Sequence, residues 1–568
     1  MTAAPARRGR VRIEGQFLLF CLILGLVALF VLYPIVIIIV KSFTAGGVAQ
    51  PLAWSLDGWR QALTDPTLIE PVWNSVRLLF AIQIVSLPTA VIVAWLLGRT
   101  DLPGRSFIEF MFWVTFFLPP LSVTLGWIVL MDPQSGALNH ALSPILGFAP
   151  FDIYSFTGIV WAHLSSSSIA IKVMLLTPMF RNLDASFEEV ARVSGANRLQ
   201  TLARVVAPLM LPAILTVLVL AMIRAMQTFE VEMVLGPPFN FWIYGTKIYN
   251  LVAQEPPEFG PATALATVGL VIITPLIFIQ RWLLTRRDYS SVSGRMRLAP
   301  MPLGRWRWPV FGVVVALVIL LTLVPVVFVV MASFMKLFGF FDIPDPWTTE
   351  HWRIIFADEL FLASFWSTVK LAVGAALFAV ALCSLVAYFT VRSRYPGRAV
   401  LDFLSWLPFA MPGILLGLGF LYVFLGNPVL RVFYGSTALL VLATVIANMT
   451  LGVQVLKTNM VQLGVEMEEA ARTSGASWFY TFRKVVVPIL MPTLVLVGVL
   501  NFISSARDIS SIVLLAANAT KTLSLLQLDF IVEGRTEAAA VISVIVIVLT
   551  TGVAFLARLL GLRLGIRH

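Results

Sequence analysis

A polar segment with closely spaced charges occurs twice in a chain that is otherwise strongly apolar. The copies, offset by 280 residues, are Glu188-Glu-Val-Ala-Arg-Val-Ser-Gly195 followed by Pro208 and Pro212, and Glu468-Glu-Ala-Ala-Arg-Thr-Ser-Gly475 followed by Pro488 and Pro492. Carboxylates and guanidinium groups at this density can form charge-assisted hydrogen bonds with another protein. A polar segment that is repeated without gaps between apolar runs indicates a docking surface, used once in each half.

The residues around each copy predict a helix–turn–helix that leads into a membrane span. Glu188 and Arg192 are one helical turn apart, which favours a helix, and Gly195 suits a left-handed helix end. A second short helix is expected over 198–206, and proline is tolerated in the first turn of the span that follows. The candidate docking residues are Glu188, Glu189, Ala191, Arg192, Gly195, Pro208, Glu468, Glu469, Ala471, Arg472, Gly475 and Pro488.

A purely structural role for these glutamates is the alternative. Ser186 and Glu189 have the spacing of a capping box, in which both side chains satisfy backbone N–H groups at a helix start. In the second copy the position of the serine is Glu466, yet Glu469 is still present. Capping therefore explains one copy and not the other, and the docking role is favoured.

Composition places the elements that carry these segments in a membrane. Of 568 residues, 59% are hydrophobic and 12% charged, and the mean hydropathy is +0.92. Runs of about 20 apolar residues cross a bilayer as helices. The sequence predicts an all-α membrane protein with twelve spans, near 16–40, 74–98, 107–131, 157–180, 207–229, 262–284, 309–333, 365–391, 400–425, 435–457, 487–505 and 537–559.

Charge fixes the expected orientation. The net charge is +11, and the basic residues are scattered over short alternating loops, which is typical of cytoplasmic loops and argues against a nucleic-acid partner. Both repeated segments and both termini are therefore expected in the cytoplasm. The run after the N-terminal arginines is too long for a signal peptide and is expected to be retained.

The two halves predict parallel six-helix repeats. The pairs Pro34 and Pro325, Trp73 and Trp366, Pro103 and Pro396, Pro119 and Pro412, and Gly126 and Gly419 match between them. An even number of spans separates the repeats, so both have the same orientation in the membrane. The offset near Pro119 is 293, and we expect the 13 extra residues in the outer loop at 131–156. The predicted domains are 1–290 and 309–568, joined by a basic linker at 291–308.

Ionisable residues near the spans are candidates for the transport pathway, since charge is costly in lipid. Lys172 lies inside span four, and other charges follow spans five and eleven; interfacial anchoring explains them equally well. The serine run 165–168 is interpreted as close helix packing. No histidine or cysteine spacing fits a metal site. The candidate pathway residues are Arg224, Glu230, Glu232, Arg507 and Asp508.

The repeated segment resembles the EAA motif of the membrane subunits of binding-protein-dependent ABC importers. Glu189, Ala191 and Gly195 match it with Val190 as a departure, and the second copy matches from Glu469 to Gly475. The resemblance implies that each motif docks in a groove of an ATPase subunit, where its glutamate pairs with basic residues. A P-loop ends in Gly-Lys, and the chain contains no Gly-Lys dipeptide. The chain is therefore expected to be no enzyme, and to have no catalytic residue and no cofactor of its own, with ATP bound by partners.

The fused layout, with 244–249, 261–264 and 507–510, resembles the ferric-iron permease group. This resemblance implies a bacterial inner-membrane permease, two ATPase subunits and a periplasmic or lipid-anchored binding protein. Permeases for thiamine, polyamine or phosphonate have similar halves and stay open as alternatives. A secondary transporter does not need duplicated docking segments, and a membrane enzyme would need a constellation of intramembrane His, Asp or Glu.

Overall fold

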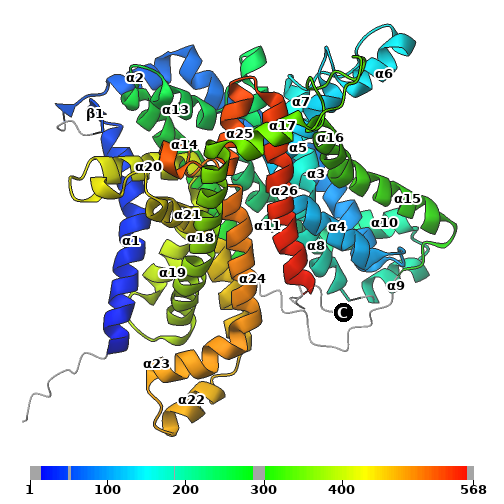
Figure 1. The fold of residues 1–568 in the computed structure, drawn as a ribbon. Helices are drawn as coiled ribbons and strands as arrows, with labels where there is room; N and C mark the ends of the chain where they lie inside the picture. Colours follow the sequence, from blue (N-terminus) through cyan, green and yellow to red (C-terminus); the bar gives the residue numbers. More distant parts are fainter. Residues whose placement is uncertain (1–14, 49–52, 185, 286–300, 560–568) are drawn as a thin grey trace, which may run out of the picture.

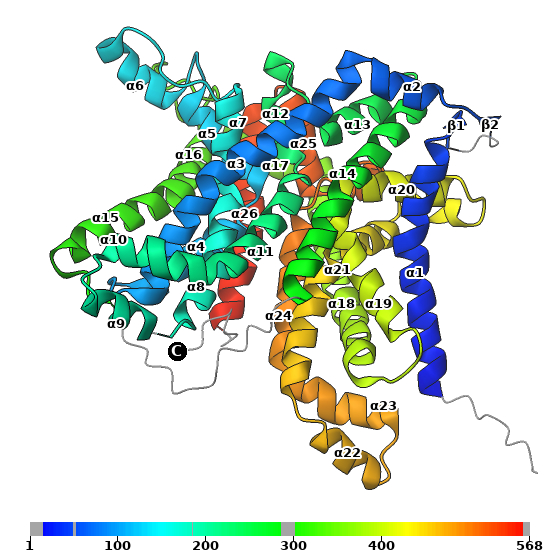
Figure 2. The same cartoon turned by 180° about the vertical axis from the view of Figure 1, so that it is seen from behind.

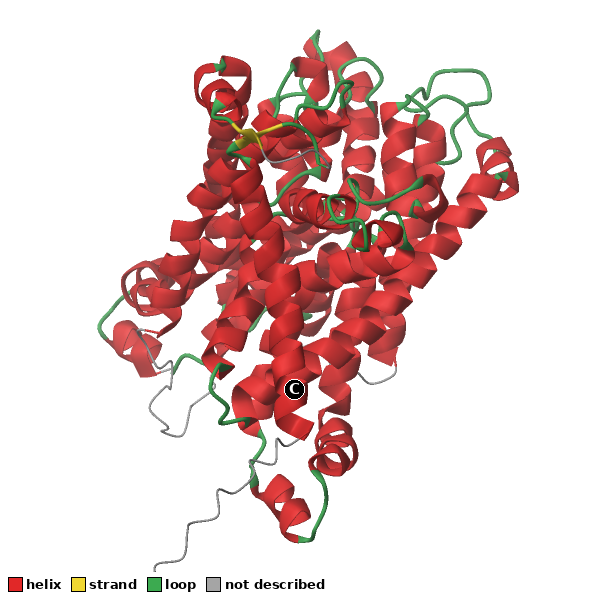
Figure 3. Cartoon of the chain, turned by 90° about the vertical axis from the view of Figure 1, so that its left-hand side faces the viewer, coloured by secondary structure: helices red, strands yellow, loops and turns green. Residues whose placement is uncertain are grey.

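The chain folds almost entirely into helices (Figure 3). The computed structural model describes residues 15–48, 53–184, 186–285 and 301–559. Ten continuous helical spans are long and apolar enough to cross a membrane: Gly15–Lys41, Pro66–Arg99, Phe156–Arg181, Leu202–Ala225, Phe259–Leu283, Gly304–Ala332, Glu359–Arg392, Thr437–Gln462, Trp478–Ala506 and Thr536–Leu559. Each coincides with a predicted span, so the all-α membrane fold is confirmed.

The third and ninth expected spans are broken, which corrects the sequence prediction. In the first half α4 (Arg105–Phe117) and α5 (Pro120–Met131) meet at 96°. In the second half Arg398–Ala410, comprising α19 (Arg398–Trp406) and η6 (Leu407–Ala410), meets α20 (Gly413–Leu425) at 112°. The residue before each matched proline, Leu118 or Met411, has an extended backbone. Proline forces this conformation on its predecessor and lacks an N–H, so the helix cannot continue.

The first helix of each half packs against the other half. Helix α1 (Gly15–Lys41) lies on α20, and α16 (Val324–Ala332) lies on α5. The contact is so close that a Cβ on Gly126 would lie 2.2 Å from the Pro325 carbonyl oxygen. A Cβ on Gly419 would lie 2.7 Å from Pro34 Cβ. The matched glycines and prolines of the two repeats thus form reciprocal contacts that hold the halves together.

The extra length of the first half divides into two parts. The N-cap residues Ser155 and Ser436 are 281 apart, and the carbonyls of Leu183 and Leu463, which accept bonds from the matched Arg99 and Arg392, are 280 apart. Twelve of the 13 residues therefore precede Ser155, in the loop that carries α6 (Ala137–Leu146). The last one is accommodated by the π-helix η1 (Leu164–Ser168), where a single insertion widens the turn.

The two repeated segments lie at the same end of the helical bundle (Figures 1 and 2). The opposite end carries short helices, among them α2 (Asp57–Thr64), α13 (Tyr244–Ala253) and α17 (Glu350–Ala357), with the two-stranded β1 (Thr44–Ala45) and β2 (Ala53–Trp54). Helix α1 begins near the second segment, where Arg472 Nη2 donates to Gln16 Oε1 (3.2 Å). Most of the predicted linker, 286–300, lies outside the described residues, so the domain division stays a prediction.

Candidate coupling segments and central cavity

Each repeated segment folds as two short helices joined by a glycine turn. These are α9 (Ser186–Val193) with α10 (Arg198–Thr201), and α22 (Glu466–Thr473) with α23 (Trp478–Thr481). Gly195 and Gly475 have φ of 83° and 87°. In both copies the N–H after the glycine bonds to a carbonyl five residues earlier, on Ala191 or Ala471, at 3.0 Å. This is the Schellman helix end that favours glycine.

Both segments continue into a span without interruption. The π-helices η2 (Leu202–Val206) and η8 (Phe482–Val486) lead into α11 (Ala207–Ala225) and α24 (Val487–Ala506). Pro208 and Pro488 lie in the first turns of these helices, where no intrahelical N–H is lost. A force on α9 or α22 is therefore transmitted along α11 or α24.

The two glutamates of the second copy have different environments. Glu468 Oε1 lies 2.9 Å from Arg392 Nε, its Oε2 accepts a bond from the Tyr388 hydroxyl (3.1 Å), and the pair is largely buried. The adjacent Glu469 is exposed. The start of α22 has no side-chain cap, so Glu469 does not act as a cap. Glu468 is thus held within the chain, and Glu469 is free for a partner.

The side chains of Glu188 and Arg192 lie outside the described residues, but other side chains of α9 form an exposed apolar surface. Val193 is 87% exposed and Val190 67%. Phe187 and its counterpart Met467 are also exposed. Apolar side chains exposed beside charges are typical of a protein interface.

A polar cavity of about 260 Å³ lies between the halves, beside both helix breaks. Its walls include Phe116 and Pro120 from the first break and Phe409 and Gly413 from the second. Of the predicted pathway residues, Arg224, Glu230, Arg507 and Asp508 line it, together with Lys172. The cavity therefore collects charges from segments that are far apart in sequence. Burial and the charge of Asp508 raise the pKa of Glu230, which lies on α12 (Glu230–Leu235) beyond the span.

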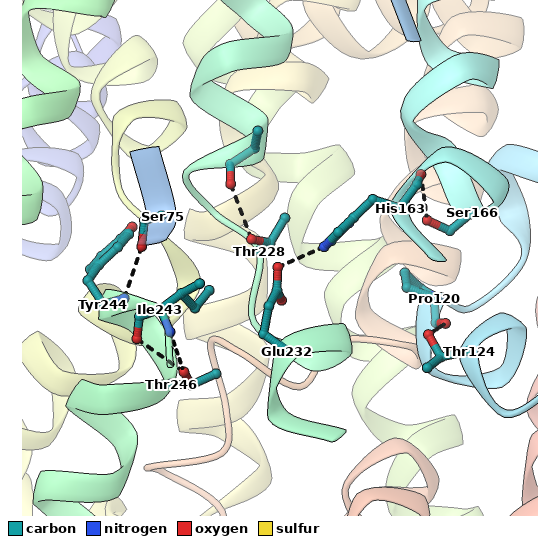
Figure 4. Close-up of polar contacts among 11 residues, drawn as sticks. Ser75, Pro120, Thr124, His163, Ser166, Thr228, Glu232, Ile243, Tyr244 and Thr246 are labelled. Atoms are coloured by element: carbon teal, nitrogen blue, oxygen red, sulfur yellow. Dashed lines mark hydrogen bonds and ion pairs between the residues drawn. The ribbon is translucent and has the colours of Figure 1, made fainter. Parts of the chain in front are cut away.

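The fifth predicted pathway residue, Glu232, is placed differently. It is fully buried, and its Oε1 lies 2.7 Å from His163 Nε2 (Figure 4). It belongs to the packing around the cavity rather than to the wall. Sequence reasoning did not pair these residues, because His163 lies on α7 (Phe156–His163), far from Glu232 in the chain.

The serine run also contributes to the cavity wall, which its interpretation as helix packing did not anticipate. Ser166, Ser167 and Ser168 line the cavity from η1. The signal was the one-residue insertion, because π-helical turns often occur at functional sites. Among the described residues, no group of three His, Cys, Asp or Glu side chains could hold a metal ion.

Two parallel repeats around a polar cavity, with a segment on one face continuous with a span in each, define a membrane transport protein. The family model described as "Binding-protein-dependent transport system inner membrane component" matches residues 86–289 and 379–566. The chain belongs to this family. It is a multi-pass permease of the inner membrane.

Curated relatives cover most of the chain. FbpB 1 of Haemophilus influenzae is 27% identical over 514 residues, which are 89% of this chain and 78% of that protein. The ferric transport system permease protein FbpB of Actinobacillus pleuropneumoniae is 26% identical over 564 residues, or 95% and 77%. The sulfate transport system permease protein CysT of Salmonella typhimurium is 30% identical over 230 residues, or 38% and 82%. A solved bacterial alginate ABC transporter matches 48% of this chain and 96% of its own at 16% identity, with a TM-score of 0.39.

Proposed function

We propose that this chain is the permease of an ATP-driven ferric-iron importer. The observation that carries the proposal is the match to ferric permeases along 89% and 95% of the chain, which includes both repeats and both motifs. The sulfate permease matches only 38% of it. The near-complete match favours ferric iron over thiamine, polyamine or phosphonate, and the duplicated docking segments favour an ABC permease over a secondary transporter.

Two ATPase subunits are proposed to dock on α9 and α22. The exposed Glu469 and the half-buried Glu189 offer carboxylates, and the apolar residues of α9 offer contact area. The ATPases bind the ATP, and this chain supplies the docking surface and the pathway. Both termini are then cytoplasmic, and the binding protein, periplasmic or lipid-anchored, delivers substrate at the opposite face.

The continuity from motif to cavity provides the mechanism. Helix α11 has the first motif at its cytoplasmic end and Arg224 near its other end, in the cavity wall. Helix α24 joins the second motif to Arg507 in the same way. When the ATPases close on ATP, they push α9 and α22, and the two spans move the cavity wall. The cavity then changes from inward-open to outward-open.

The proposal is tested by uptake in cells without other iron importers that express the cognate ATPase and binding protein. We expect iron-55 accumulation that depends on this chain. Accumulation of labelled thiamine or putrescine with no iron-55 signal would overturn the ferric assignment and leave the importer architecture intact.

A further inference from the structure

The charges that line the cavity are not balanced. Lys172, Arg224 and Arg507 contribute three basic groups, and Glu230 and Asp508 contribute two acidic groups. Asp508 is already bonded to the Ser511 hydroxyl. Among the described residues, no carboxylate lies within the 4.0 Å ion-pair distance of the charged nitrogens of Arg224 or Lys172. Two cations in the wall are therefore without a counter-ion.

Arg224 is the more accessible of these two cations. Its side chain is exposed to the cavity, and its guanidinium carbon lies 5.4 Å from the centre of the Phe409 ring. Stacking on an aromatic face holds a guanidinium group in place without using its N–H donors. Its planar set of N–H donors therefore stays available for a ligand with two oxygens.

Lys172 is held in place but not saturated. Its Nζ donates to Ser86 Oγ and to the carbonyl oxygen of Ser168, both at 2.8 Å. An ammonium group has three N–H donors, so one remains. The hydroxyl groups of Ser166 and Ser167 line the same cavity from the π-helical turn. The site thus combines two uncompensated cations with neutral hydrogen-bond donors, which is the chemistry that binds phosphate and carboxylate oxyanions.

These cations belong to the first half alone. At the offset of 280, Arg224 corresponds to Ser504 and Lys172 to Gly452. A twofold-symmetric role in holding the halves together would need the same charge in both repeats. The asymmetry indicates a site for a ligand on one side of the cavity.

We infer that the cavity binds a multiply charged oxyanion through Arg224 and Lys172. On the proposed ferric function, iron then crosses this cavity as a complex with phosphate or a polycarboxylate, and not as the bare trivalent ion. A bare ferric ion would meet a wall with more cations than carboxylates. A ferric complex with excess negative charge presents its outer oxygens to the two cations.

Binding of the oxyanion is measured directly on the purified permease in lipid nanodiscs, with phosphorus-32 phosphate and carbon-14 citrate as separate probes. We expect saturable binding of one or both by wild type, weakened about tenfold or more in Arg224→Gln, because a charge-assisted bond is lost. Arg224→Lys should recover part of the affinity, and Arg353→Gln, an exposed arginine on α17, should bind as wild type does. Equal affinity in wild type and Arg224→Gln, or binding of neither probe by wild type, overturns the site.

The form of the transported iron is decided by dual-label uptake in proteoliposomes that contain the ATPases and binding protein. Iron-55 entering with phosphorus-32 supports a phosphate complex, and iron-55 entering with carbon-14 supports a carboxylate complex. Iron-55 entering with neither label overturns the inference while the ferric function stands. No iron-55 uptake by wild type contradicts the ferric function itself, and the binding experiment still decides the oxyanion site.

Discussion

The guanidinium of Arg507 donates to the carbonyl oxygen of Phe116 at 2.7 Å and to that of Leu118 at 3.0 Å. Arg507 follows α24 of the second half, and the two carbonyls end α4 of the first half, where the helix break leaves them without intrahelical partners. Gln227 forms the reciprocal contact by donating Nε2–H to the Phe409 carbonyl at 2.6 Å. Each half thus caps the broken helix of the other, and the capping residue lies at the end of the span that carries the coupling segment.

The first prediction concerns this reciprocal cap. Arg507→Ala leaves two carbonyls unsatisfied, which costs about 1–3 kcal/mol for a buried group. We expect a lower melting temperature of the purified permease and ATP hydrolysis with reduced transport. Arg507→Gln keeps a donor of the kind that Gln227 supplies at the other break, so its loss should be smaller. An Arg507→Ala permease with wild-type melting temperature and uptake would show that the cap has no role.

The second prediction separates the glutamates of the motif. Glu189→Ala combined with Glu469→Ala should weaken co-purification of the ATPases and leave the melting temperature unchanged, because these side chains face outward or are half-buried. Glu468→Ala should instead lower the melting temperature, since it strands Arg392; losing one partner of a buried charge pair costs roughly 2–5 kcal/mol. If the double variant melts early and still binds the ATPases, the glutamates are structural and docking is lost as their role.

The third prediction concerns the reciprocal contacts between the halves. Gly126→Ala places a Cβ 2.2 Å from the backbone oxygen of Pro325, which cannot move away as a flexible side chain would. Overpacking of this kind costs about 1–3 kcal/mol, so we expect a lower melting temperature. Gly25→Ala on α1 is the matched control, because nothing lies within 4 Å of its Cβ position. Equal melting temperatures for both variants would contradict the close packing.

The fourth prediction concerns orientation. In a variant without Cys21 and Cys383, single cysteines at Arg295 and Asp345 should be labelled from opposite sides of the membrane, with Arg295 in the cytoplasm. Arg295 lies in the predicted basic linker, outside the described residues, and Asp345 follows the seventh span. Labelling of both positions from one side would contradict the topology.

Hydropathy predicted the spans because length and apolar content alone decide whether a helix crosses a bilayer. It could not show that two spans are broken, since the residues on both sides of Pro119 and Pro412 are equally apolar. The prolines carried that signal, and the repeat made it stronger. The packing of α1 on α20 was invisible, because contacts between distant segments leave no local pattern.

The cavity was only partly predictable. Its charged residues were found because ionisable groups near spans are unusual. The burial of Glu232 against His163 and the bonding of Glu468 to Arg392 depend on tertiary contacts, and no sequence spacing indicates either pair. The π-helical turn at Ser165 became recognisable only when the N-caps and helix ends of the two halves were aligned.

The account is tested most directly by ATP-dependent iron-55 uptake into proteoliposomes that contain this permease, its ATPases and its binding protein. We predict uptake by wild type in the presence of ATP and its loss in the Glu189→Ala, Glu469→Ala double variant, with the variant permease still folded. Equal uptake by wild type and the double variant, or no ATP-dependent iron-55 uptake by wild type, would contradict the account.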